Sequence, residues 1–270
     1  MSKVIYNLKA FKDDFTEDFL STPDFVTKDT NSEGFRSDEF TNIHNEKHII
    51  FSGCSNTFGV GLEKNEGWAW KTYQKIIKQE KCSGFFNLGA SGTGIAHIII
   101  NIFKYCKKYG NPEVIFINLS NQNRSFSYSN EIKGYCLSFG NGDRREDIKL
   151  YNYQYYFMLE QYCKSNNIKL FSFTWDTIGT GNFFLKSFLQ STFYANKIAE
   201  ESTNSLFKKY NFDTFYSYDF ERMIDDLKSL QNDSNDKYFI TARDNMHYGI
   251  GYNTIWSNFI YDKYVKDSYV

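Results

Sequence analysis

The chain has 270 residues, with 31 basic and 32 acidic side chains and a formal net charge of −1. This length suits one main domain with a sizeable core. The near-neutral charge, without a long basic stripe, argues against a nucleic-acid partner. The five cysteines are widely spaced and form no C-x-x-C pair, which argues against zinc or redox chemistry. We expect free thiols, no metal and no cofactor.

The first residues and the composition of the chain predict the compartment in which it is synthesised. The first residues soon meet acidic side chains and lack the apolar run of a secretory signal, and no segment approaches the roughly 20 apolar residues of a membrane span. We therefore expect synthesis in a reducing cytoplasm without a signal peptide. Abundant Lys, Asn, Ile, Phe and Tyr suit an AT-rich genome, viral or bacterial.

From His48 onward, short apolar runs alternate with amphipathic stretches, as in a parallel sheet covered by helices. The predicted strands are 48–51, 85–88, 114–117 and 168–173. The predicted helices are 68–79, 95–109, 151–162, 220–230 and 248–264. The pattern predicts an α/β domain over 47–270, preceded by a polar N-terminal arm, 1–46, that packs on it. Residues 125–149, rich in Ser, Gly, Asn and charge, predict an insertion after the third strand. Apart from the helix predicted at 220–230, the segment 179–236 is hard to divide into helices and strands.

Ser55 directly follows the first predicted strand, within the segment Gly53-Cys54-Ser55-Asn56-Thr57-Phe58-Gly59. Open α/β sheets place ligands at the carboxyl ends of their strands, so its hydroxyl is a candidate nucleophile. The plainer alternative is a turn made by the two glycines, with Ser55 as a helix cap. No glycine stands two residues after Ser55, which excludes the G-x-S-x-G nucleophile elbow.

The second predicted strand runs into a glycine-rich segment, Asn87-Leu88-Gly89-Ala90-Ser91-Gly92-Thr93-Gly94. Glycines let backbone N–H groups approach an oxyanion or another anion closely. A phosphate site is the rival interpretation, but the spacing matches neither G-x-G-x-x-G nor the P-loop pattern.

Asp244 and His247 stand three residues apart, just before the last predicted helix. One turn can hold the carboxylate beside the imidazole and select its tautomer, which makes the other ring nitrogen a base. A surface Asp-His pair is the alternative, and a metal site would need a third ligand that the sequence does not indicate. Of the other histidines, His44 lies in the arm, His48 begins a strand, and His97 lies in a helix where packing is its expected role.

Together these segments resemble the SGNH (GDSL-type) hydrolase family, in which separate blocks carry Ser, Gly, Asn and His. Gly53-Cys54-Ser55 resembles the first block, Gly89 the second and Asp244-Asn245-Met246-His247 the last, and Gly34-Phe35-Arg36-Ser37 is similar to a lead-in before the first strand. The resemblance implies a three-layer α/β/α sandwich around a flavodoxin-like, five-stranded parallel sheet. It also implies Ser55 as nucleophile, His247 as general base and Asp244 as its orienter, with the Ser55 and Gly89 N–H groups in an oxyanion hole.

Two positions depart from the family pattern. Cys54 replaces the Asp of Gly-Asp-Ser, which leaves the nucleophile and base unchanged. In the third block, Ser120-Asn121-Gln122-Asn123 stands where the family has Gly-x-Asn-Asp. An ungapped alignment places Gln122 at the oxyanion-hole position, with Asn121 and Asn123 on either side, so which amide completes the hole is open.

The sequence thus predicts a serine esterase that removes a small acyl group, acetyl above all, from a carbohydrate or other small ester through an acyl-serine intermediate. Asn123 and Arg124 are candidate substrate-binding residues, and Arg144 and Arg145 in the insertion are available to an anionic substrate. A non-catalytic binding or structural module on the same fold, and an acyltransferase using the same residues, are the alternatives. The sequence leaves the oligomeric state open.

Overall fold

The computed structural model describes residues 30–41, 47–120, 124–129, 134–139, 144–174, 220–232, 236–244 and 247–268. Its strands are β1 (Ile49–Gly53), β2 (Phe86–Asn87), β3 (Val114–Leu119), β4 (Arg124–Ser129), β5 (Gly134–Phe139) and β6 (Lys169–Thr174). Its helices are α3 (Ser55–Phe58), the 3₁₀ turn η1 (Lys64–Glu66), α4 (Trp68–Ile76), α5 (Ile95–Tyr109), α6 (Arg144–Ser165), α9 (Phe220–Asn232) and α10 (Ile250–Ser268).

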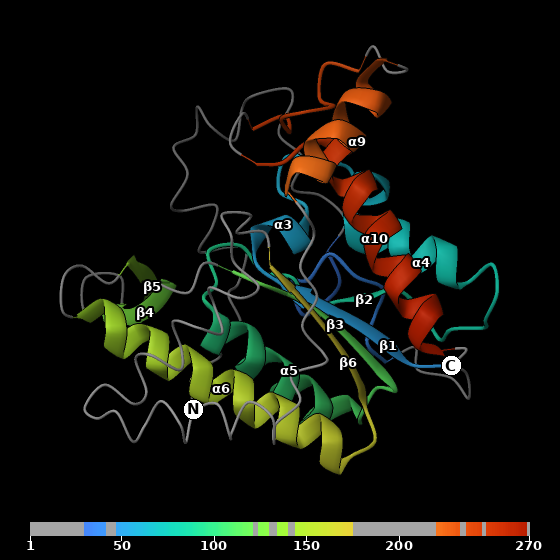
Figure 1. Cartoon of the computed structure of the whole chain (residues 1–270). Helices are drawn as coiled ribbons and strands as arrows, with labels where there is room; N and C mark the ends of the chain where they lie inside the picture. The colour runs from blue at the N-terminus through green and yellow to red at the C-terminus, as the bar shows by residue number, and fades with distance from the viewer. Residues whose placement is uncertain are drawn as a thin grey trace, which may run out of the picture.

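Four of the strands form one parallel sheet in the order β2-β1-β3-β6 (Figure 1). Counted along this sheet, the order is second, first, third, fourth, which is the flavodoxin-like order of doubly wound α/β folds. The predicted parallel α/β architecture is confirmed. The described residues supply four strands of the main sheet, where the family resemblance implies five.

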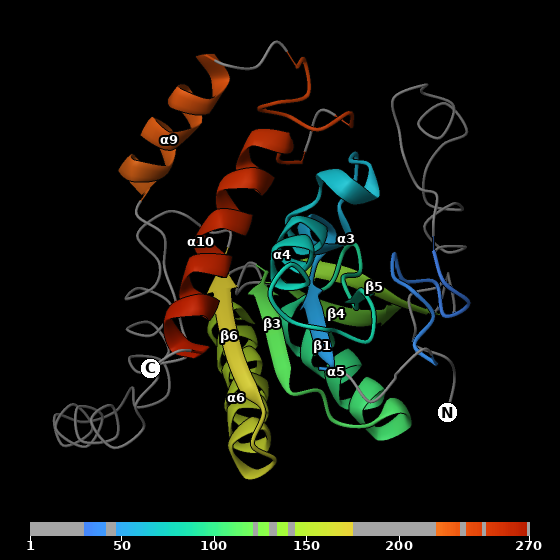
Figure 2. The ribbon, with the colours of Figure 1, turned by 90° about the vertical axis from the view of Figure 1, so that its right-hand side faces the viewer.

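Alternate residues of the strands face opposite helical layers. Ile50, Ile115 and Ile117 pack against α5 and α6, whereas Phe51 and Phe116 pack against α4 and α10. Figures 1 and 2 show these helix pairs on the two sides of the sheet. Because both faces are covered, the strands consist of continuous apolar runs, as in other buried parallel sheets.

The core of the α4–α10 layer contains a ladder of aromatic rings that crosses three strands. Phe116 on β3 stacks between Phe51 on β1 and Phe171 on β6, with ring centroids 5.1 Å apart on each side. All three rings are buried. Aromatic side chains thus supply much of the apolar surface that holds the central strands together.

Residues 30–41 pack against the edge of the sheet near β2. The Asp38 N–H donates to the Phe85 carbonyl at 2.9 Å, and Phe35 and Phe40 are buried in the α5–α6 core layer. The rest of the predicted arm, 1–29 and 42–46, lies outside the described residues.

Several elements differ from the sequence prediction. The predicted insertion contains an antiparallel hairpin, β4–β5, and the first turns of α6, which begins at Arg144 and not near Tyr151. The charged residues 144–147 hide the apolar periodicity there, although Arg and Glu favour helices. The short α3 and η1 lie between the predicted strand 48–51 and the predicted helix 68–79, where the sequence predicted no helix. No described helix is long and apolar enough to span a membrane.

Candidate active site

Ser55 begins α3, two residues after β1 ends at Gly53. A β-carbon on Gly53 would lie 2.0 Å from Thr57 Oγ1 and 2.8 Å from the Asn118 carbonyl, so only glycine lets α3 fold back over the strand ends. Gly59 ends α3 in the left-handed conformation, with φ of 81°. The two glycines therefore place Ser55 at the carboxyl edge of the sheet, next to the point between β1 and β3 where the strand order reverses.

The Ser55 side chain has no capping role. The N-cap of α3 is Cys54, no side chain caps the helix, and Ser55 Oγ makes no hydrogen bond to the described residues. The residue is only 5% exposed. At this edge of the sheet, a hydroxyl that makes no structural hydrogen bond to the described residues favours the nucleophile over the helix-cap alternative.

Asp244 and His247 form the predicted pair. His247 Nδ1 hydrogen-bonds to Asp244 Oδ2, and the His247 backbone N–H donates to Asp244 Oδ1 at 3.1 Å. The Asp244 side chain is fully buried, while His247 keeps 21% of its side chain exposed. In a neutral imidazole, an Nδ1 proton directed at the carboxylate leaves Nε2 unprotonated, which is the tautomer that a general base requires.

The Asp-His turn lies against the loop that continues from the Ser55 helix. The Arg243 backbone N–H donates to the Gly61 carbonyl at 3.0 Å. A β-carbon on Gly61 would lie 2.9 Å from Asp244 Oδ1. The fold thus brings together two segments that lie 182 residues apart in the sequence. No hydrogen bond joins Ser55 to His247 in this structure, and such bonds commonly form only once substrate is bound.

Gly89 packs directly on the backbone of α3. A β-carbon there would lie 2.5 Å from the Phe58 nitrogen. Asn87 links the two segments, because its Nδ2 donates to the Thr57 carbonyl at 2.9 Å while its Oδ1 accepts the Gly89 N–H at 2.8 Å. The Gly89 N–H is therefore already engaged, and donating to an oxyanion requires that this bond be shared or that the Asn87 amide turn away.

The remaining predicted residues follow β3. Asn121, Gln122 and Asn123 lie outside the described residues, so the amide that would complete the oxyanion hole stays a prediction. Arg124 begins β4, and its carbonyl accepts from Asn152 Nδ2 at 3.0 Å beside the start of α5. Arg144 and Arg145 begin α6, and the structure describes only their backbone.

Two buried histidines have structural roles. His48 Nε2 hydrogen-bonds to the Tyr105 hydroxyl at 2.5 Å, and burial lowers its pKa to about 4. His97 is buried in α5, and burial together with Lys104 lowers its pKa to about 4. Both imidazoles are neutral at pH 7. Within the described ranges, no three His, Cys, Asp or Glu side chains gather as a metal site would need.

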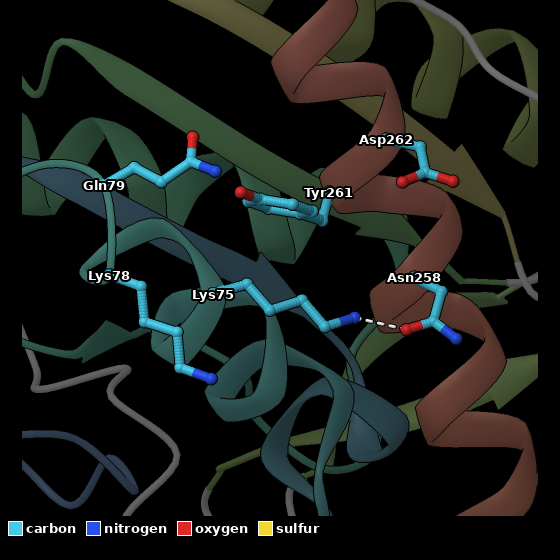
Figure 3. Close-up of a pocket in the computed structure, with 6 residues that line it drawn as sticks. All are labelled: Lys75, Lys78, Gln79, Asn258, Tyr261 and Asp262. Carbon is cyan, nitrogen blue, oxygen red and sulfur yellow. Dashed lines mark hydrogen bonds between the residues drawn. The ribbon is translucent and has the colours of Figure 1, made fainter.

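A surface hollow of about 490 Å³ lies between the end of α4 and α10 (Figure 3). Lys75 crosses its floor to hydrogen-bond to Asn258, and burial lowers the pKa of this lysine to about 8. The hollow lies beside the end of α4, which leads back toward the amino ends of the strands. It therefore takes no part in the site at the carboxyl edge.

Sequence reasoning missed the residues that hold the site together. Arg36 from the arm donates to the Gly59 and Leu62 carbonyls, both at 2.7 Å, and Arg243 forms an ion pair with Glu66. Arg36 belongs to the quoted lead-in, and Arg243 directly precedes Asp244, but nothing local shows what either side chain contacts. Their partners lie 23 to 177 residues away.

The chain matches no family model and no curated protein. Among solved structures it is similar to a lipolytic protein of the G-D-S-L family from Desulfitobacterium hafniense, with 16% identity and a TM-score of 0.44, over 81% of this chain and 99% of that one. It is also similar to the esterase EstA from Pseudoalteromonas, with 16% identity and a TM-score of 0.44, over 81% and 96% of the two chains. The acetyl xylan esterase AlAXEase matches at 16% identity and a TM-score of 0.43, over 80% and 98%. At these TM-scores, function must be argued from the site itself.

Proposed function

We propose that this chain is a serine ester hydrolase in which Ser55 is acylated and His247 is the base. The observation that carries the proposal is the buried Asp244 carboxylate bound to His247 Nδ1, in a turn packed against the loop that follows Ser55. A serine hydroxyl needs such a base because it is a weak nucleophile near neutral pH.

In the proposed reaction, His247 Nε2 takes the proton as Ser55 Oγ attacks the ester carbonyl. The proton then passes to the leaving alcohol, and a water activated by the same nitrogen hydrolyses the acyl-serine. Asp244 stabilises the imidazolium formed in both steps. The N–H of Ser55, which has no acceptor in the described residues, is the first donor to the oxyanion, and Gly89 is the second once Asn87 releases it.

The finer proposal is that the acyl group is small, acetyl above all, and that the alcohol is a carbohydrate or another small molecule. It is supported by the sequence blocks that resemble SGNH hydrolases. Arg124, at the start of β4, and Asn123, which precedes it in the sequence, are the proposed substrate contacts. Transfer of the acyl group to a sugar hydroxyl would use the same residues, with the acceptor in place of water.

One observation favours the non-catalytic alternative, a binding or structural module. The Gly89 N–H already donates to Asn87, so one expected oxyanion donor is occupied. Losing one such donor typically costs about 10²–10³ in rate, which would weaken an enzyme without changing its mechanism.

The test is labelling with a fluorophosphonate probe together with hydrolysis of p-nitrophenyl acetate. Ser55→Ala and His247→Ala are expected to abolish labelling and to lower turnover by at least about 10³-fold, because the base and nucleophile act as a unit. Ser165→Ala is the matched control, since this exposed serine at the end of α6 would react if labelling were unspecific. A folded wild-type protein that is neither labelled nor active would refute the hydrolase and leave the binding module.

A further inference from the structure

An ion pair joins the Asp-His turn to the segment that follows the Ser55 helix. Arg243 Nη1 lies 2.5 Å from Glu66 Oε2, and Nη2 lies 3.0 Å from Oε1. The two side chains are only 15% and 18% exposed. The Tyr238 ring covers the guanidinium at 4.4 Å. Two parallel N–H···O bonds fix direction as well as distance, which a single lysine contact would not do.

Each end of the pair is attached to a different part of the candidate site. Glu66 Oε2 also accepts the Glu63 N–H at 2.8 Å, which closes the capping box of η1. Arg243 directly precedes Asp244 and bonds through its backbone to Gly61. The ion pair and this backbone bond together hold the Asp-His turn at two points of the chain from α3 to α4.

The Glu66 carboxylate is charged in this pair. Burial alone would raise the pKa of Glu66, yet its hydrogen bond and proximity to Arg243 hold that pKa below its ordinary value. The carboxylate therefore stays charged near neutral pH. Removing one member of a largely buried pair leaves the other charge without its partner, which disturbs the local structure more than loss of an exposed pair does.

We propose that Arg243 and Glu66 are positioning residues that hold the His247 imidazole at the distance and angle from which it can deprotonate Ser55. This inference rests on the proposed function. Neither side chain need touch the substrate. A small displacement of a base relative to its nucleophile costs up to about 10²-fold in rate, while substrate affinity stays nearly constant.

The experiment compares Glu66→Gln and Arg243→Gln with Glu80→Gln. Glu80 pairs with Lys47 at 2.5 Å, with side chains 23% and 22% exposed, and Lys47 lies just before β1, at the amino end of the sheet. All three variants remove an ion pair of similar burial, so they report the cost in stability alike. Turnover of p-nitrophenyl acetate, the rate of fluorophosphonate labelling and the melting temperature are measured for each.

Glu66→Gln and Arg243→Gln are expected to lower kcat and the labelling rate about 10- to 100-fold, with KM within about twofold of the wild type. Glu80→Gln is expected to keep kcat within about twofold. The charge exchange Glu66→Arg with Arg243→Glu is expected to recover part of the lost rate. Equal kcat losses in Glu66→Gln and Glu80→Gln, or a change in KM alone, would overturn the positioning role.

A second measurement separates this inference from the hydrolase itself. The Nδ1 proton of His247 is followed by NMR in the wild type, Glu66→Gln and Glu80→Gln. Its resonance is expected to shift or broaden in Glu66→Gln alone, whether or not the protein turns over ester. An inactive wild type that shows this selective shift would refute the hydrolase and keep the positioning role, and an unchanged resonance would refute the positioning role.

Discussion

Replacing Arg36 by Met tests whether the N-terminal segment holds the Ser55 loop in place. Arg36 is 2% exposed, and its Nη1 donates to the Gly59 and Leu62 carbonyls at 2.7 Å each. Its guanidinium lies 5.0 Å from the centre of the Phe58 ring. Methionine fills a similar volume but supplies neither the charge nor the two donors.

The expected loss follows from these contacts. A hydrogen bond to a charged group contributes about 1.5–3 kcal/mol, and a cation–π contact about 0.5–2 kcal/mol. Because such contributions are not fully additive, we expect Arg36→Met to lower the free energy of unfolding by about 3–5 kcal/mol. Arg36→Lys keeps the charge but loses the planar fork, so it should lose about half as much.

Urea denaturation followed by tryptophan fluorescence measures the effect, since Trp68 and Trp256 are buried in the core. Lys228→Met is the control, because Lys228 is 70% exposed and its pairing with Asp225 should contribute less than about 0.5 kcal/mol. A loss for Arg36→Met below about 1 kcal/mol, close to that of the control, would refute the reasoning.

Three further predictions concern other parts of the fold. Gly89→Ala should lower the free energy of unfolding by about 1–3 kcal/mol and slow probe labelling, because the added β-carbon would lie 2.5 Å from the Phe58 nitrogen. An unchanged urea midpoint together with an unchanged labelling rate would contradict this prediction. Phe116→Ala should lower the free energy of unfolding, measured by urea denaturation, by about 3–5 kcal/mol, because the substitution empties the centre of the aromatic ladder. A loss under about 1.5 kcal/mol would show that the neighbouring rings collapse into the gap. Burial lowers the pKa of His48 from 6.5 to about 4. Between these pH values the unfolded chain therefore binds more protons than the folded protein, and the free energy of unfolding should fall as the pH drops from 6.5 to 4. His48→Gln should flatten this dependence in unfolding measured at several pH values, and an unchanged slope would argue against a neutral His48.

Local patterns predicted the parallel α/β architecture and named the candidate residues. Continuous apolar runs predict strands buried on both faces, and the periodicity of 95–109 predicts α5 with its exact bounds. The Asp244–His247 contact is also local, since it spans one turn. The position of Ser55 after β1 needs only the rule that ligands bind at the carboxyl ends of parallel strands.

Tertiary structure alone decided how these pieces meet. The Arg243–Glu66 pair, the contact of Asp244 with Gly61 and the engagement of Gly89 with Asn87 depend on chain segments brought together by the sheet order. A sequence pattern reports which face of an element is apolar, because burial repeats with the period of the helix or strand. It carries no such period for a single arginine or asparagine, whose partner is chosen by packing between distant elements.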